Sequence, residues 1–398
     1  MASPPPPPPP QPEVVEDFFG YVKVYSDGSI YRSNNNNPRN LLLHDHHYTN
    51  TVHYKDCLFD KQHNLYLRLY KPATPPFTKL PILFYFHGGG FCGISRGNPR
   101  PHNLCFRLAE GLQALVISLY YRLAPEHRLP AAVDDGLNAL RWLQGQGKLR
   151  DSGDEKEVWL CEEVVDFDNV FVFGDSSGGN MAHHLAVRLT PGSVELEPVR
   201  VRGYVMLTPF FGGMVRTKRE EERPCEAFWS QHIFDQMWRL AAPVGSDRDH
   251  PLVNPFGPSS PSLENVGLDP ILVMVGGEEV LSDRVKEYAR RLKEMGKNIE
   301  IVVFEEKEHG FFTEHPRSEM AETVLLIVKG VWAFYAFLMK DWFLGVPNGN
   351  GFLLGAAQLA LYAIYWKPMT NQTSTSHDLE KNEQQEQKHL VPPPNTGS

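Results

Sequence analysis

The sequence has few cysteines, no excess of positive charge and no apolar leader at its start. Its five cysteines are scattered without C-x-x-C spacing, which argues against a disulfide framework or a zinc site and favours reduced thiols in the cytosol. The net charge of −9 gives no reason to expect a nucleic-acid partner. The first residues, including the run Pro4–Pro10, lack the basic and apolar regions of a signal peptide. We therefore expect a cytoplasmic protein, with the nucleus left open as a further location.

The chain is long enough for one large domain with appendages. Its 398 residues can hold an α/β domain of about 300 residues. The cluster His44-Asp45-His46-His47 has no second group of potential ligands, so we interpret it as a loop and expect no metal. We divide the chain into a disordered proline-rich start, an N-terminal arm that caps the domain, the α/β domain itself, a hydrophobic segment and a disordered polar tail (1–12, 13–53, 54–329, 330–369 and 370–398).

Short apolar runs alternate with helical patterns from about residue 54 to 328. Alternating polar and apolar residues at 65–70 predict an antiparallel edge strand, and the continuous apolar runs predict buried parallel strands. The aromatic-rich segment 210–243 breaks this rhythm and is predicted to form part of a cap. The pattern favours a mostly parallel, doubly wound sheet. We predict further strands at 82–86, 114–119, 170–173, 201–207, 271–275 and 299–304, and helices at 131–142, 178–189, 284–295 and 316–328.

Two glycine-rich motifs follow predicted strands. Gly174-Asp175-Ser176-Ser177-Gly178-Gly179 has the form G-x-S-x-G, in which a serine occupies a tight strand-to-helix turn and glycines allow the close approach of strand and helix. His87-Gly88-Gly89-Gly90-Phe91 is a loop whose backbone N–H groups can bind an oxyanion. In this order, the two motifs predict acyl transfer through Ser176 as nucleophile.

The nucleophile requires a base and an orienting acid, which in this fold follow the serine in the chain. His309, directly after the last predicted strand, is the candidate base, whereas His183 and His184 are predicted to face away from the turn. The acid belongs after the strand at 271–275. Glu279 and Asp283 are the main candidates, with Glu278 as a weaker third, and position alone leaves them open.

Four motifs in order resemble those of the plant carboxylesterase family, a branch of the α/β hydrolases that also contains the gibberellin receptors. They are His87–Phe91, Tyr121–Glu126, Gly174–Gly179 and His309–Phe311, and the likeness extends over about residues 13–329. The resemblance implies an α/β-hydrolase fold with Glu279 as the acid and Asp283 as the N-cap of the following helix. A glutamate there is similar to the branch associated with strigolactone hydrolysis. The resemblance also implies that the family's receptors have lost the histidine present here as His309.

Together, the residues and the resemblance assign a role to each group of the site. The N–H groups of Gly88, Gly89 and Ser177 are expected to bind the oxyanion. His87, Gly90, Asp175 and Asp283 are expected to support the site, and no metal or organic cofactor is required. We predict a serine carboxylesterase that acts on a small, fairly apolar ester or lactone, with a non-catalytic hormone receptor as the alternative.

The C-terminal part of the chain does not fit a hydrolase. Residues 342–366 carry no charge, and 346–366 could form a membrane anchor. Residues 331–336 and 346–365 are similar to the last two membrane helices of SWEET sugar transporters. Two helices cannot form a transport pathway. A fused gene model and a membrane-anchored esterase both fit this pattern, and we favour the fusion.

Overall fold

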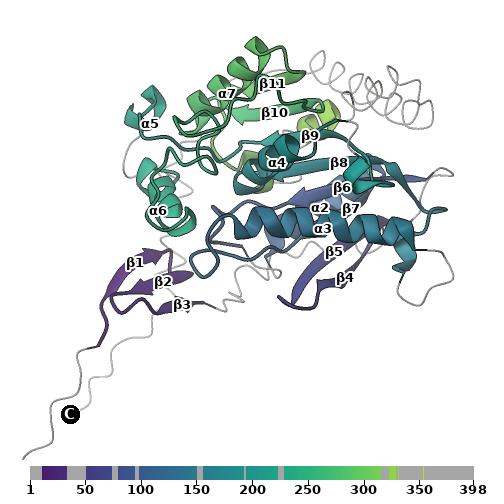
Figure 1. The fold of residues 1–398 in the computed structure, drawn as a ribbon, viewed down its shortest axis with the longest axis horizontal. Coiled ribbons are helices and arrows are strands. Elements are labelled where there is room, and N and C mark those ends of the chain that lie inside the picture. The colour runs from purple at the N-terminus through teal and green to yellow at the C-terminus, as the bar shows by residue number, and fades with distance from the viewer. Residues whose placement is uncertain are drawn as a thin grey trace, which may run out of the picture.

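The protein contains an eight-stranded main sheet and a separate three-stranded sheet at its N-terminus (Figure 1). The structure, a computed structural model, describes residues 11–33, 51–73, 79–94, 98–149, 156–191, 194–222, 228–314, 322–328, 330 and 353. The main sheet has the strand order β11-β10-β9-β8-β6-β7-β5-β4. Its strands are β4 (Val52–Asp60), β5 (Leu65–Pro72), β6 (Leu80–Phe86), β7 (Leu115–Leu119), β8 (Val165–Asp175), β9 (Val201–Leu207), β10 (Ile271–Gly276) and β11 (Ile299–Phe304).

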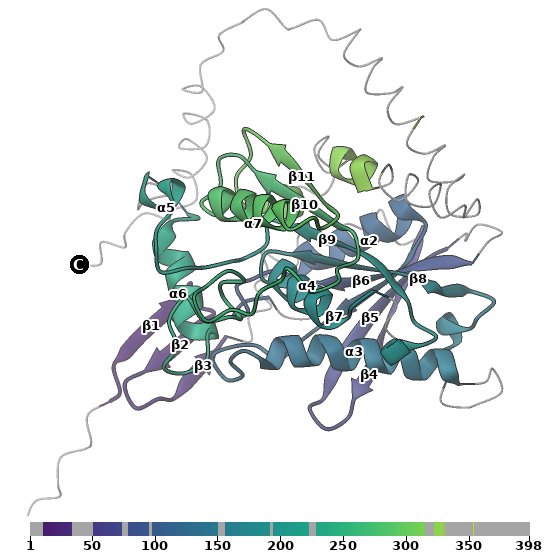
Figure 2. The same ribbon diagram turned by 45° about the horizontal axis from the view of Figure 1, so that its top comes forward.

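Six of these strands are parallel, and helices cover both faces of the sheet (Figures 1 and 2). Successive residues of a strand point to opposite faces: Ile82 and Phe84 of β6 pack with α3, α4 and α7, whereas Leu83 and Tyr85 pack with α2 and with the helical residues 322–328. The fold is that of an α/β hydrolase, as predicted. The longer helices of this domain are α2 (Pro99–Leu112), α3 (Ala131–Lys148), α4 (Ser177–Arg188) and α7 (Ser282–Glu294).

Local sequence accounts for the ends of several helices. The Asn98 side chain accepts the Arg100 N–H at 3.0 Å and caps α2, whose first residue is proline. Gly296 has a φ of 70° and follows the end of α7, where the sequence predicted a stop. The predicted strands all exist; the largest difference is at β8, which begins at Val165, five residues before its predicted start. Helix α2 was not predicted, and α3 continues beyond its predicted end.

The position predicted for β5 is wrong. This strand pairs with β4 on one side and β7 on the other, so that β4 forms the edge of the sheet. β5 alternates because Leu65, Leu67 and Leu69 are buried while the residues between them are half-buried. Alternation reports unequal burial of the two faces, and it does not distinguish an edge strand from its neighbour.

The N-terminal sheet and the aromatic-rich segment 210–243, called the inserted segment from here on, lie together at one end of the domain (Figure 1). Strands β1 (Val14–Phe18), β2 (Val22–Tyr25) and β3 (Ile30–Arg32) are antiparallel. The inserted segment contains the short helix α5 (Lys218–Glu222) and α6 (Gln231–Ala241). Glu16 of β1 accepts hydrogen bonds from Gln236 at 2.9 Å and Arg239 at 2.7 Å, both on α6. These contacts hold the N-terminal sheet against the inserted segment.

The chain after His309 is described in part. The short helix α8 (Phe311–Glu314) and the helical residues 322–328 lie within the predicted hydrolase region. Among the described residues, no helix is long and apolar enough to cross a membrane. Apart from Leu353, the predicted segment 346–366 falls outside them, as does the cluster at 44–47.

The helical residues 322–328 pack on the face of the sheet that carries α2. Val324, Leu325 and Val328 are buried there, and the Leu325 side chain faces Gly111 of α2. We expect Leu325→Ala to lower the free energy of unfolding by about 2–3 kcal/mol, because it leaves a cavity in this cluster. The half-buried Leu326 provides a matched control, whose change to alanine should cost less than about 1 kcal/mol. Urea unfolding of both variants tests this, and equal losses would contradict the packing described.

Candidate active site

Four residues of the predicted site lie at the same edge of the sheet. His87 follows β6, Ser176 follows β8, Glu279 comes three residues after β10, and His309 comes five residues after β11. Because these strands are parallel, their carboxyl ends converge, which is where ligands bind in open α/β sheets. All four side chains are buried, with exposed fractions between 1% and 7%.

The turn at Ser176 has a backbone conformation that side chains other than glycine rarely adopt. Ser176 has φ 50° and ψ −114° and stands directly before α4. A Cβ atom on Gly178 would lie 1.9 Å from the Phe86 carbonyl oxygen, and one on Gly174 would lie 2.1 Å from the Gly178 oxygen. Only glycine fits these positions, so the motif's glycines allow the serine to stand at the tip of the turn.

Ser176, His309 and Glu279 form a continuous line of hydrogen bonds. His309 Nε2 lies 3.0 Å from Ser176 Oγ, and His309 Nδ1 lies 2.9 Å from Glu279 Oε2. A carboxylate accepts hydrogen bonds, so Nδ1 carries the proton and Nε2 is free to accept the serine hydroxyl. Burial raises the pKa of Glu279, and the hydrogen bond from His309 opposes that rise. The structure thus brings together the predicted nucleophile, base and acid.

The two other candidate acids are hydrogen-bonded to Arg219. Arg219 donates its backbone N–H to Asp283 at 3.0 Å and its guanidinium to Glu278 at 2.7 Å. The prediction that Asp283 caps the helix is wrong: Leu281 occupies the N-cap, and Asp283 lies within the first turn of α7. There its negative charge still interacts favourably with the helix dipole.

The sequence offered two other histidines, His183 and His184. Both lie on α4, and each is bonded to a residue outside that helix. His183 Nδ1 bonds the Tyr288 hydroxyl at 3.0 Å, and His184 Nε2 bonds the Leu252 carbonyl at 3.2 Å. Burial lowers the pKa of both, so both imidazoles stay neutral at pH 7. Neither faces Ser176, as the sequence predicted.

His87 stabilises the glycine loop, as expected. Its Nδ1 donates to the Gly88 carbonyl at 2.8 Å, and burial lowers the pKa of the imidazole to about 4, so the ring is neutral at pH 7. The Tyr121 ring stacks on His87 at 4.3 Å, while its hydroxyl donates to the His87 carbonyl at 2.8 Å. The same hydroxyl lies 3.3 Å from Ser177 Oγ. Tyr121 therefore connects the loop to the turn that carries Ser176.

Asp175 forms a second connection between loop and turn. Its carboxylate accepts the Tyr85 hydroxyl at 2.6 Å. Burial raises the pKa of Asp175 to about 6 despite this bond. The same carboxylate lies against the glycine loop, where a Cβ atom on Gly88 would be 2.5 Å from Asp175 Oδ2. Motif reasoning missed Tyr85, which lies next to the last residue of β6, and it named Tyr121 only as part of a family motif, without this role.

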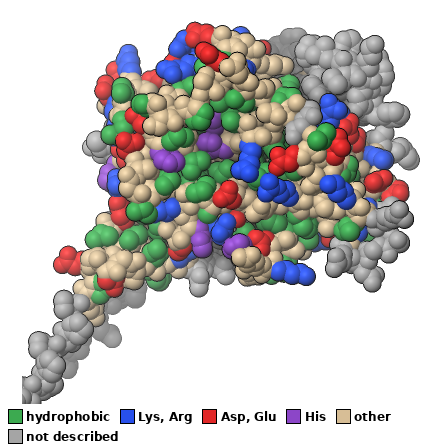
Figure 3. All heavy atoms as spheres, viewed as in Figure 1, with side chains coloured by type: hydrophobic (Ala, Val, Ile, Leu, Met, Phe, Trp, Pro, Cys, Tyr) green, Lys and Arg blue, Asp and Glu red, His purple; other side chains and the backbone are tan. Residues whose placement is uncertain are grey.

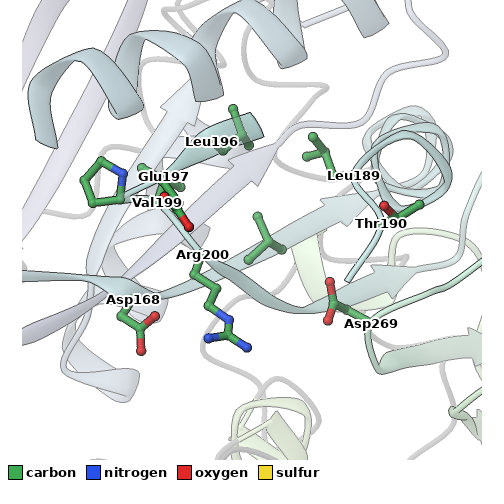
Figure 4. Close-up of a pocket in the computed structure, with 10 residues that line it drawn as sticks. Asp168, Leu189, Thr190, Leu196, Glu197, Val199, Arg200 and Asp269 are labelled. Carbon is green, nitrogen blue, oxygen red and sulfur yellow. The ribbon is translucent and has the colours of Figure 1, made fainter. Parts of the chain in front are cut away.

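A separate cavity of about 200 Å³ lies at the opposite edge of the sheet, where β8, β9 and β10 begin (Figure 4). Asp168, Arg200 and Asp269 line it together with apolar side chains such as Leu189 and Leu196. It is separated from Ser176 by the length of the strands.

Acidic and basic side chains are interspersed over the face shown in Figure 3. In the described part of the chain, no group of three or more metal-binding side chains comes together.

Comparison with known proteins relates this chain to carboxylesterases and to gibberellin receptors. Residues 83–313 match the family model described as alpha/beta hydrolase fold. Carboxylesterase 20 of Arabidopsis thaliana is 37% identical over 73% of this chain and 89% of its own length. The 3-O-acetylpapaveroxine carboxylesterase CXE2 of Papaver somniferum is 38% identical over 69% and 88%. The gibberellin receptor GID1C of Arabidopsis thaliana is 36% identical over 65% and 74%.

Solved structures agree with this grouping. An esterase from Pyrobaculum calidifontis has a TM-score of 0.58 and 26% identity, and the likeness covers 72% of this chain and 87% of that one. The protein therefore belongs to the α/β-hydrolase fold family and, within it, to the plant carboxylesterases. It is a carboxylic ester hydrolase.

The C-terminal stretch matches a different family. Residues 319–370 fit the family model of a sugar efflux transporter for intercellular exchange, in agreement with the resemblance found in the sequence. The match begins six residues after the hydrolase model ends, and it includes the helical residues 322–328 that pack on α2.

The buried Asp175 predicts a specific pH dependence of stability. Its pKa of about 6 exceeds the ordinary value of about 4, so between these pH values the native state binds more protons than the unfolded state. Stability due to this group therefore falls as pH rises from about 4 to 6. We expect the free energy of unfolding of Asp175→Asn, relative to the natural protein, to rise over this window by on the order of 2 kcal/mol. Urea unfolding of both proteins at several pH values measures this. If their free energies of unfolding change with pH in the same way, the prediction is contradicted.

Proposed function

We propose that Ser176, His309 and Glu279 form a catalytic triad that hydrolyses a small, fairly apolar carboxylic ester or lactone of the plant hormone or secondary-metabolite type. The observation that carries the proposal is the buried line of hydrogen bonds from Ser176 Oγ through His309 to Glu279. Two plant relatives named for a carboxylesterase activity on an acetylated metabolite support the substrate class.

In this mechanism, Ser176 Oγ attacks the ester carbonyl carbon while His309 Nε2 removes its proton. The tetrahedral intermediate collapses, His309 protonates the departing alcohol, and an acyl-enzyme forms on Ser176. A water molecule, deprotonated by the same imidazole, then releases the acid. Glu279 keeps the proton on Nδ1 and stabilises the imidazolium formed in both steps.

The oxyanion is assigned to the N–H groups of Gly88, Gly89 and Ser177. Gly88 lies beside the turn, because a Cβ atom on it would be 3.2 Å from Ser176 Cβ, and Gly89 follows it in the same loop. Ser177 begins α4, whose N-terminus favours negative charge.

The alternative is a receptor that binds its ligand without turnover, since gibberellin receptors are among the relatives. The resemblance associates such receptors with loss of the catalytic histidine. Here His309 is present and is hydrogen-bonded to both Ser176 and Glu279, which favours hydrolysis.

Substitution of the nucleophile tests the proposal directly. A fluorophosphonate probe should label Ser176, and Ser176→Ala should abolish labelling and lower kcat for p-nitrophenyl acetate by roughly a millionfold. The Ser177→Ala variant controls for changes at the turn, because it removes the neighbouring hydroxyl and retains the nucleophile. Continued labelling of the Ser176→Ala variant would refute the assignment.

The identity of the acid is tested by a pair of variants. Glu279→Ala should lower kcat by roughly 10⁴-fold, because the imidazole loses the group that fixes its tautomer. Asp283→Ala should keep kcat within about tenfold and lower the free energy of unfolding by about 0.5–1 kcal/mol, through loss of charge in the first turn of α7. Steady-state kinetics and urea unfolding measure the two effects. An inactive Asp283→Ala variant beside an active Glu279→Ala variant would show that the acid is misassigned.

A further inference from the structure

Two aromatic side chains of the inserted segment contact the imidazole of His309. The Trp229 ring lies 5.0 Å from the His309 ring with an interplanar angle of 68°, and the Phe234 ring lies at 5.2 Å with an angle of 86°. Both are edge-to-face geometries, the favoured arrangement for aromatic pairs. Neither residue belongs to a recognised catalytic motif.

His309 depends on such contacts because its own backbone does not confine the ring. It lies in the loop after β11, followed by Gly310 with a φ of 80°. The hydrogen bonds to Ser176 and Glu279 act at two ring nitrogens, along one line through the imidazole. Rotation about that line is opposed only by what packs against the ring, and Trp229 and Phe234 pack there.

The inserted segment is itself held in place. Phe234 is 1% exposed and lies 5.6 Å from the Phe210 ring, and the Phe210 N–H donates to the Ser176 carbonyl at 2.9 Å. Trp229 and Phe234 also contact each other at 5.9 Å. The rings therefore form a support that is fixed relative to Ser176.

We propose that Trp229 and Phe234 are positioning residues for His309, which hold its imidazole in line with Ser176 Oγ and exclude water from its faces. This inference rests on the proposed function. A ring that is free to tilt spends less time within hydrogen-bond reach of Oγ, and a displacement of about 1 Å can cost roughly 100-fold in rate. The rings act on every step that uses the histidine, independently of the acyl group on the substrate.

Steady-state kinetics of the full-length protein separate positioning from substrate contact. Trp229→Leu and Phe234→Leu should each lower kcat about 10- to 100-fold, with KM changed less than about threefold. The loss should be equal for p-nitrophenyl acetate, butyrate and hexanoate, because the rings act on His309. Trp229→Phe, which retains an aromatic ring, should recover most of kcat.

Phe167→Leu provides the matched control. Phe167 is a buried phenylalanine near the start of β8, at the opposite end of the sheet, so its loss should reduce stability and leave kcat unchanged. A second readout is the low-field proton NMR signal of the imidazole Nδ1–H, which should broaden in Trp229→Leu and persist in Phe167→Leu.

The possible outcomes are distinguishable. A loss of kcat that depends on acyl length would show that Trp229 and Phe234 contact substrate, and would overturn the proposal. Unchanged kcat in both leucine variants would also overturn it while leaving the triad intact. If Ser176→Ala retains activity, the proposed function itself fails.

Discussion

The close backbone contact between the turn at Ser176 and the end of β6 determines the rest of the site. Gly178 lies so near the Phe86 carbonyl that no side chain fits between them. This contact fixes the start of α4 against the strand that leads into the glycine loop. Ser176, the proposed nucleophile, and the glycine loop are therefore positioned by one junction of the main sheet, and their relative position does not depend on flexible side chains.

Burial around this junction explains the polar network that surrounds it. Asp175, Glu279 and His87 have little contact with solvent, so their polar atoms depend on partners from the protein, and among the described residues the buried Oε1 of Glu279 has none. Tyr85 and Tyr121 supply hydroxyl donors at positions where water would otherwise bond. The same desolvation raises the pKa of both carboxyl groups and lowers that of His87. Burial thus fixes the directions of the hydrogen bonds, but it also makes the charged forms of the Asp175 and Glu279 carboxyl groups less favourable.

The sequence predicted those features that depend on neighbouring residues. The parallel strands have continuous apolar runs, and the turn at Ser176 requires glycines at fixed spacing, so both are visible locally. Contacts between distant segments were not predictable in this way. The edge position of β4 depends on strand order, and the role of Asp283 depends on Arg219, which lies 64 residues earlier. Resemblance to a family, and not spacing, favoured Glu279 over Asp283.

The inserted segment, which the sequence predicted to form part of a cap, contacts two parts of the site. Met237 of α6 lies against Gly90, where an added Cβ would be 2.3 Å from its sulfur, and Phe234 one turn earlier lies against His309. One face of a single helix thus contacts both the glycine loop and His309, the proposed base. Substitutions on this face should therefore change the geometry of the proposed triad even at positions that no substrate touches.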